Sequence, residues 1–440
     1  MVSAARRAEV IDTLRRGTVP RAGLDLFAVG MERFERAIEE ELDGVEAGRA
    51  VFKAVRGEYG TGKTFFARWL AERAKRRGMA AAEIQISETE TPLHKLETVY
   101  RRLVEQLSTA AYPPSALREI VDAWFYTLEE DVLAEGVIEA DNSNKLAEAV
   151  DALMERRLAE VARTTPAFAS ALRAYRNATL SDDQATAQSL IAWIGGQPNV
   201  SAAARRAAGV KGDLDHFAAL GFLQGLLTIL RDSGHPGLLV VLDEIETLQR
   251  VRSDVRDKGL NALRQLIDDV DSGRFPGLYL LITGTPAFYD GPQGVTRLTP
   301  LAQRLATDFG TDPRFDSPRA VQIRLTGFDL PKLAKLGIAI RDVYAAGQER
   351  VDLITARVDD SYIEELARAV AGDLGGQVGI APRIFLRKLV ADVLDRVAEF
   401  DEFDPRQHYK LTLSKAELTD TERNAAAFQA QSADDVELDL

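Results

Sequence analysis

Short runs of aliphatic residues are the clearest pattern along the chain. They are five to seven residues long, and glycine, proline or acidic residues follow several of them. Runs of this length, when they lack helical spacing, predict strands. Strands that are apolar on both faces are typical of a parallel sheet covered by helices on each side. We therefore predict an α/β fold class with a five-stranded parallel sheet, built from residues 51–56, 81–87, 238–242, 278–283 and 320–325.

Apolar positions at helical spacing predict helices before, between and after these strands, at residues 31–42, 65–73, 92–107 and 330–400. Pro92 is expected to open the third of these helices. Residues 112–235 are helical over a length far beyond an ordinary connection between two strands, so we interpret them as a large inserted helical unit. The last helical region is broken at residues 372–379, which are rich in glycine.

The length of 440 residues is too great for one ordinary hydrophobic core, so several packing units are expected. We divide the chain into five parts. An N-terminal segment with the first part of the core covers residues 1–111, a helical insertion covers 112–235, and the second part of the core covers 236–329. A C-terminal helical lid covers 330–415, and an acidic tail that is predicted to be disordered covers 416–440. No internal repeat is visible.

Composition excludes several classes of site. The chain has no cysteine, which rules out disulfides and thiolate metal ligands and fits a reducing cytoplasm. Its four histidines are scattered, which argues against a transition-metal centre. Neither a signal peptide nor an apolar run of membrane-spanning length is apparent, so we expect a cytoplasmic protein that does not enter a membrane. The net charge of −13 argues against broad attachment to nucleic acid, and we interpret the basic clusters at 73–77 and 383–396 as solvated helix faces.

A glycine-rich motif follows the first predicted strand. Residues 57–64 match the pattern G-x-x-x-x-G-K-[ST], and a predicted helix follows them. The glycines let successive backbone N–H groups converge on phosphate oxygens, and the helix N-terminus adds a favourable dipole. We expect Lys63 to reach the β- and γ-phosphates and Thr64 to hold Mg²⁺. The sequence therefore predicts that ATP and Mg²⁺ bind at Gly57, Glu58, Tyr59, Gly60, Thr61, Gly62, Lys63, Thr64 and Phe65.

Two acids follow the third predicted strand. Asp243 is expected to hold the Mg²⁺ shell opposite Thr64, and Glu244 to orient and polarise the water that attacks the γ-phosphate. Two solvated acids after a strand are common in any α/β protein, so this pair gains its meaning from the phosphate loop upstream. The phosphate loop and the two acids together predict ATP hydrolysis in addition to ATP binding.

Further polar residues are candidates for contact with the nucleotide. Thr283, or Thr285 beside it, ends the next apolar strand, where a side chain could touch the γ-phosphate or the attacking water. Arg304 could act as an arginine finger across a subunit interface, which predicts a homo-oligomer in the presence of ATP. Arg383 could reach the nucleotide from the lid. Arg252 and Arg256 are alternative candidates for these arginine roles. Val19, Pro20 and Phe27 are candidates for contact with adenine.

Six stretches together resemble a known family, at residues 17–20, 56–64, 242–248, 283–288, 300–305 and 381–383. They look like the ATP-binding proteins of BREX bacteriophage-exclusion systems, the BrxC/BrxD type, and the short chain is more similar to BrxD. The resemblance implies an AAA+-like P-loop NTPase core within an antiphage defence system and a large DNA helicase as partner. It implies functional roles for Lys63, Thr64, Asp243 and Glu244, and a finger and a lid contact for Arg304 and Arg383.

The leading hypothesis is an ATP-hydrolysing switch or remodeller that acts on DNA together with other defence proteins. An alternative is a nonhydrolysing module that binds DNA or assembles partners when ATP is bound. A third class, a small-molecule kinase, is disfavoured by Glu244 and by the large helical insertion, because a kinase must hold an acceptor rather than polarise water.

Overall fold

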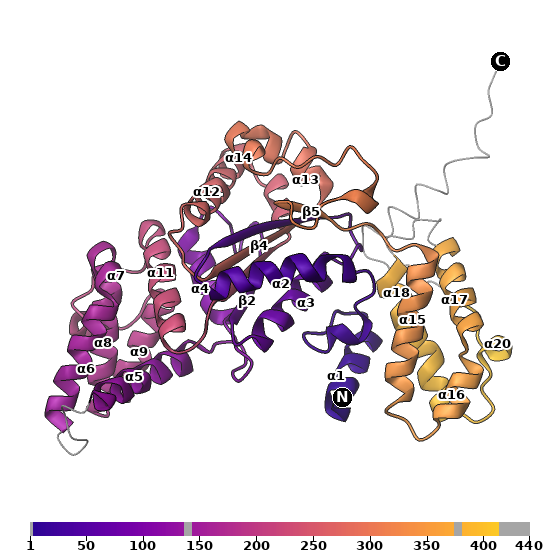
Figure 1. Cartoon of the computed structure of the whole chain (residues 1–440), viewed down its shortest axis with the longest axis horizontal. Coiled ribbons are helices and arrows are strands. Elements are labelled where there is room, and N and C mark those ends of the chain that lie inside the picture. The colour runs from indigo at the N-terminus through magenta and orange to yellow at the C-terminus, as the bar shows by residue number, and fades with distance from the viewer. Residues whose placement is uncertain (1–2, 136–142, 374–380, 413–440) are drawn as a thin grey trace.

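The computed structural model describes residues 3–135, 143–373 and 381–412. A twisted sheet lies at the centre of an elongated molecule, with one group of helices at each end (Figure 1). The five predicted strands are confirmed, with bounds β1 Val51–Arg56, β2 Ala80–Gln85, β3 Leu238–Asp243, β4 Leu278–Gly284 and β5 Gln322–Arg324. All neighbours in the sheet are parallel, in the order β2-β3-β4-β1-β5. The loop strand β1 is thus separated from the acidic strand β3 by β4.

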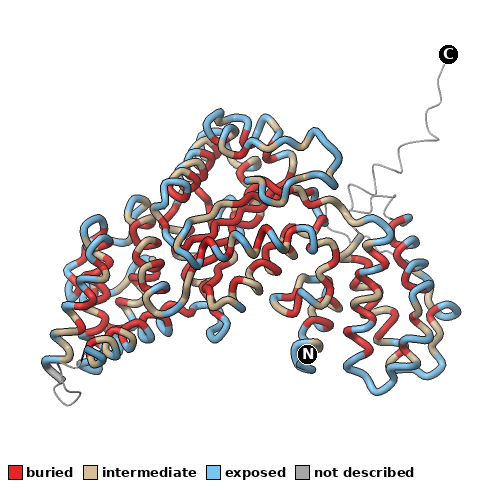
Figure 2. The backbone as a smooth tube through the Cα atoms, viewed as in Figure 1, coloured by how far each residue is buried: buried red, intermediate tan, exposed pale blue. Residues whose placement is uncertain are grey.

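Both faces of the sheet are buried (Figure 2). Along β3, Leu238, Val240 and Leu242 belong to one hydrophobic core, and Leu239 and Val241 belong to the other. This alternation is the period of two that a strand imposes on its side chains. It explains why the strands appear as continuous apolar runs in the sequence, since neither set of side chains faces water.

The core on one face joins the sheet to the helices that follow β2, β3 and β4 and to the insertion. These helices are α4 Leu96–Gln106, α5 Leu117–Ala134, α6 Ser143–Arg157, α7 Ala159–Thr164, α8 Pro166–Leu180, α9 Gln184–Ile194, α10 Ala202–Ala207, α11 His216–Asp232, α12 Ser253–Asp271, α13 Pro286–Asp290 and α14 Thr299–Arg304. The insertion is packed on the sheet through α4 and α11, and its core around Trp124 and Phe168 is continuous with that of the sheet.

The core on the other face contains α1 Ala4–Arg15, α2 Glu32–Glu46 and α3 Lys63–Arg76, together with the helices of the lid. The lid consists of α15 Leu330–Ala345, α16 Val351–Arg357, α17 Asp360–Asp373, α18 Ala381–Arg387, a π-helical turn Lys388–Leu394, α19 Asp395–Glu399 and α20 Pro405–His408. The helix α1 packs against the lid rather than the sheet, and its Arg15 donates a 2.9 Å hydrogen bond to Asp395. The N-terminal helix and the lid therefore form one packed unit.

Several local expectations differ from the structure. The helix expected to open at Pro92 begins at Leu96, because Lys95 N–H donates to Pro92 C=O at 2.9 Å and closes a separate turn first. The second strand ends at Gln85 rather than at residue 87. Most of the glycine-rich break at 372–379, and the predicted tail at 416–440, lie outside the described residues. Within the described ranges, none of the helices is long and apolar enough to cross a bilayer.

A buried ion pair joins α2 to the sheet. The Lys53 side chain on β1 is only 2% exposed, and its ammonium pairs with the carboxylate of Glu41 on α2. Tyr279 on β4 donates a 2.5 Å hydrogen bond to the same carboxylate, and Lys53 also donates to Pro318 C=O at 3.0 Å. Because each partner satisfies the other's charge, removal of one leaves an uncompensated charge in the core.

We expect Glu41→Ala to lower the free energy of unfolding by about 3–5 kcal/mol, because the Lys53 ammonium then remains buried without a counter-charge. Urea denaturation followed by circular dichroism measures this loss. Glu40→Ala is the matched control, since Glu40 is 45% exposed and its solvent-screened pair with Arg319 should contribute far less than the buried pair. Equal losses of unfolding free energy in the two variants would show that the buried pair of Lys53 and Glu41 contributes no more to stability than an exposed pair does.

Candidate functional site

The glycine-rich loop connects β1 to α3, and its backbone requires glycine. Gly60 and Gly62 have φ values of 80° and 94°, in the left-handed region that side chains disfavour. A Cβ atom on Gly57 would lie 2.3 Å from the hydroxyl oxygen of Thr61. The loop is therefore a narrow turn that leads directly into the N-terminus of α3, where unpaired N–H groups favour an anion.

Lys63 is the first residue of α3, and its ammonium points back to the loop. Its Nζ donates to Gly57 C=O at 2.8 Å and to Glu58 C=O at 3.2 Å, and it lies 5.0 Å from the centroid of the Tyr59 ring. Burial lowers the pKa of Lys63, and nearby carboxylates oppose this effect, Glu246 most strongly. An ammonium held mainly by neutral carbonyls is well placed to bind an anion that enters the loop.

Asp243 lies at the carboxyl end of β3, where it meets hydroxyls from two neighbouring elements. Thr64 donates to Asp243 Oδ2 at 3.1 Å, and Thr283 on β4 donates to Asp243 Oδ1. The predicted residues Asp243 and Thr64 are thus brought together. Thr283 is fully buried and bonded to Asp243, so its hydroxyl supports the carboxylate rather than facing the cavity.

The donor set at this point fits Mg²⁺. A threonine hydroxyl and a carboxylate converge next to a phosphate loop, and Mg²⁺ prefers such hard oxygen ligands together with substrate phosphates and water. No cluster of three or more His, Cys, Asp or Glu that could hold a metal occurs among the described residues. The ion would therefore depend on phosphate oxygens from the nucleotide to complete its shell.

Glu244 has an unusual backbone and a specific partner. Its φ and ψ of 59° and 42° are left-handed, which is uncommon for a residue with a long side chain. Its N–H donates to Asp243 Oδ1 at 3.2 Å, and its carboxylate accepts a 2.8 Å hydrogen bond from Gln85 Nε2. Gln85 ends β2, the strand beside β3, so the sheet itself brings the amide to the acid.

Sequence reasoning missed Gln85 and Glu246. Gln85 lies inside the strand predicted at 81–87, whereas the strand ends at Gln85; with the right boundary, a polar residue at the end of a parallel strand would have been a candidate, because such ends share one edge of the sheet. Glu246 lies three residues after Asp243, but only the structure shows that its side chain turns inward, where it is 4% exposed.

A cavity of about 260 Å³ joins the loop to the lid. Its polar end is lined by Lys63, Thr64, Asp243, Glu244 and Glu246, and its apolar end is lined by Leu14, Val19, Pro20, Phe27, Phe328 and Leu336. Arg383 of the lid also lines it, as do the loop residues Tyr59 to Phe65. The cavity thus has a charged end beside the phosphate loop and an apolar end suited to a flat base.

The other candidate arginines lie elsewhere. Arg304 pairs with Asp268 on α12 and donates to Pro300 C=O at 2.8 Å. Arg256 donates to Leu248 and Val251 carbonyls at 3.1 and 2.8 Å, and thereby holds the segment after Glu244. Arg304, Arg252, Arg256 and Thr285 are all among the described residues, and none of them lines the cavity.

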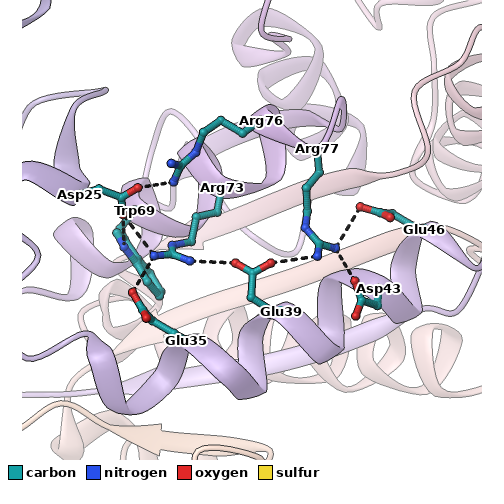
Figure 3. A network of polar contacts seen from close by, with 9 residues as sticks. All are labelled: Asp25, Glu35, Glu39, Asp43, Glu46, Trp69, Arg73, Arg76 and Arg77. Atoms are coloured by element: carbon teal, nitrogen blue, oxygen red, sulfur yellow. Dashed lines mark hydrogen bonds and ion pairs between the residues drawn. The ribbon is translucent and has the colours of Figure 1, made fainter. Parts of the chain in front are cut away.

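The basic cluster on α3 is neutralised within the chain (Figure 3). Arg73 pairs with Glu35 and Glu39 at 2.7 and 2.8 Å, and Arg77 pairs with Asp43 at 2.7 Å. Arg76 pairs with Asp25. Since these guanidinium groups already have acidic partners, the structure favours a structural role for the cluster over contact with nucleic acid.

Comparison with known proteins agrees with the resemblance found in the sequence. The model of the family described as "BREX system ATP-binding protein BrxC/D" matches residues 2–413 of the chain. A search of curated proteins finds no match.

We expect Thr283→Val to lower the free energy of unfolding by about 1–3 kcal/mol, because the buried Asp243 carboxylate loses its hydroxyl donor from β4. Thr283→Ser keeps the hydroxyl and is the matched control. Chemical denaturation of both variants measures the difference. If Ser and Val at this position were equally stable, the hydroxyl would not be what supports the carboxylate.

Proposed function

Because the chain belongs to the BREX system ATP-binding protein BrxC/D family, we propose that it is an AAA+-like switch or remodeller that binds and hydrolyses ATP in antiphage defence. The observation behind this proposal is the convergence of Thr64 and Asp243 in one cavity with Lys63 and Glu244. These residues supply a phosphate cradle, a place for Mg²⁺ and a carboxylate for the attacking water.

The architecture supports an AAA+-like core. The phosphate loop follows a central strand, the acidic strand lies two positions away, and the strand between them ends in a polar residue that bonds Asp243. A helical lid covers the cavity from the side of the N-terminal helix. ATP would therefore lie between the sheet and the lid, with its phosphates at the edge where the parallel strands end.

The mechanism follows from the position of each side chain. Lys63 leaves the carbonyls of Gly57 and Glu58 and binds the β- and γ-phosphates, and Thr64 and Asp243 would hold Mg²⁺. When bound, Mg²⁺ would neutralise negative charge on the nucleotide phosphates. Glu244 orients a water and accepts its proton as the water oxygen bonds to the γ-phosphorus and the bond to the β–γ bridging oxygen breaks.

Other residues position these groups. Gln85 donates to one oxygen of the Glu244 carboxylate and so orients it, and the other oxygen can accept the proton of the water. Val19, Pro20 and Phe27 form an apolar place for adenine, and Arg383 approaches the phosphates from the lid. In this way the presence of a γ-phosphate is reported to the lid.

Partners follow from the family rather than from the geometry. Other BREX proteins are partners by membership of the system. We propose in addition a large DNA helicase as the partner and DNA as the material on which the complex acts. The alternative is a nonhydrolysing module that binds DNA or assembles partners when ATP is bound, and the same residues would serve it except Glu244.

We expect Glu244→Gln to slow phosphate release at least about 100-fold, because the amide cannot accept the proton, while ATP still binds. Lys63→Ala should abolish ATP binding itself. Phosphate release and nucleotide binding are measured on the full chain, with Glu88→Gln, an exposed acid outside the cavity, as control.

The alternative functions give different results in this experiment. A nonhydrolysing module predicts that wild-type turnover is no faster than that of Glu244→Gln. A kinase predicts a phosphorylated acceptor among the products, whereas hydrolysis yields only ADP and phosphate.

Arg304 is proposed as a finger that acts on a neighbouring subunit, because within its own chain it is bonded to Asp268 away from the cavity. We expect Arg304→Ala to lower turnover at least tenfold. In a mixture with Glu244→Gln subunits, which retain the arginine, turnover should exceed the sum of the two variants measured separately. Turnover that remains additive would assign Arg304 to a structural contact with α12.

A further inference from the structure

Glu246 is a buried acid to which the proposed mechanism gives no task. It lies in the 3₁₀ turn Ile245–Gln249 that follows Glu244, is 4% exposed, and lines the polar end of the cavity. Among the residues that the structure describes, none donates a hydrogen bond to either of its carboxylate oxygens. A buried carboxylate without donors is rare in folded proteins, because the loss of hydration is then uncompensated.

Glu246 lies among charges of both signs. Burial raises its pKa most, the Lys63 ammonium opposes this rise, and Glu244 and Asp243 add to it with smaller effects. Conversely, Glu246 is the acid that most strongly favours the charged form of Lys63. Glu246 and Lys63 are therefore electrostatic partners across the cavity without being in contact.

A structural role does not account for Glu246. Arg256 shows how this segment is held, since its guanidinium donates to the carbonyls of Leu248, Gln249 and Val251. Glu246 makes no such bond and so does not anchor the turn. A charge that makes no hydrogen bond to the fold, yet faces the place proposed for a polyanion, can act on the ligand.

We propose that Glu246 is a counter-charge to Lys63 that weakens the binding of nucleotide phosphates and shortens the lifetime of the bound nucleotide. This inference rests on the proposed function, because it assigns the cavity to a nucleotide. In the absence of phosphate, the carboxylate helps to balance the Lys63 ammonium. When Lys63 turns to the phosphates, Glu246 faces several additional negative charges and has no donor to screen it.

The physical consequence is that the site binds nucleotide more weakly and releases it faster. Repulsion from a fixed carboxylate raises the free energy of every state with bound phosphates, ATP and ADP alike. Association of small ligands is rapid and varies little among variants, so the effect should appear mainly in dissociation. Glu246 is thus a positioning and affinity-setting residue rather than a catalytic one.

The test is nucleotide binding to Glu246→Gln, which keeps the shape of the side chain and removes its charge. We expect the Kd values for ADP and for the β,γ-imido analogue of ATP, both with Mg²⁺, to fall about tenfold, equivalent to about 1.4 kcal/mol. Dissociation of fluorescently labelled ADP, chased with unlabelled ADP, should slow by a similar factor. Neither probe requires hydrolysis.

Three controls make the result specific. Glu246→Asp keeps the charge and should bind as the wild type does. Glu88→Gln makes the same change of charge at an exposed position outside the cavity and should have no effect. Glu246→Ala also removes the charge and should likewise bind nucleotide more tightly than the wild type does. It replaces Glu246→Gln in the test if the glutamine variant does not fold.

The outcomes separate this inference from the proposed function. If the wild type binds nucleotide and the charge-removing variants bind no tighter, the counter-charge role is wrong and ATP binding stands. If Glu246→Gln and Glu246→Ala both bind nucleotide more weakly than the wild type does, Glu246 is a ligand of the nucleotide or its metal, which also overturns the inference. If the wild type binds neither probe, the proposed function and this inference fall together.

Discussion

The site depends on the bonding of one carboxylate, that of Asp243. It lies on β3, yet its two oxygens accept hydrogen bonds from Thr283 on β4 and from Thr64, which follows the loop after β1. Three adjacent strands therefore converge on a single group. A shift of register by one residue would turn every side chain of a strand to the opposite face, so the two hydrophobic cores that fix the register also fix this carboxylate.

The same packing explains why the cavity lies between the sheet and the lid. Helix α1 precedes the loop in sequence but packs on the lid, and the segment after it returns to the core, where Arg68 donates to Val19 C=O at 2.5 Å. Tyr344 and Arg15 both donate 2.9 Å hydrogen bonds to Asp395, which ties α1 to two lid helices. The apolar end of the cavity is thereby built from segments that are far apart in sequence, and a movement of the lid would move α1 with it.

Features that depend on nearby residues could be predicted from the sequence. The strands follow from apolar runs, and the loop follows from its glycines and Lys63. Contacts that depend on the order of strands could not, because no local pattern places Gln85 beside Glu244. The start of α4 was wrong by one turn, since a proline can open a turn as readily as a helix. For Arg304, the bond to Asp268 becomes visible only when α12 and α14 are packed together.

Three carboxylates lie within four residues at the end of β3, and their different hydrogen bonding is the basis for the separate roles that we propose. Asp243 accepts hydrogen bonds from two hydroxyls and a backbone N–H, so its orientation is fixed, which suits the proposed metal ligand. Glu244 accepts one bond, from the Gln85 amide, which holds the carboxylate while leaving it able to turn. Glu246 accepts none from the described part of the chain, so its charge is what acts on its neighbours. Had all three been equally bonded, the sequence Asp-Glu-Ile-Glu would give no physical ground for the different roles that we propose for the three acids. The number of hydrogen bonds on each group, set by the strands beside it, provides this ground.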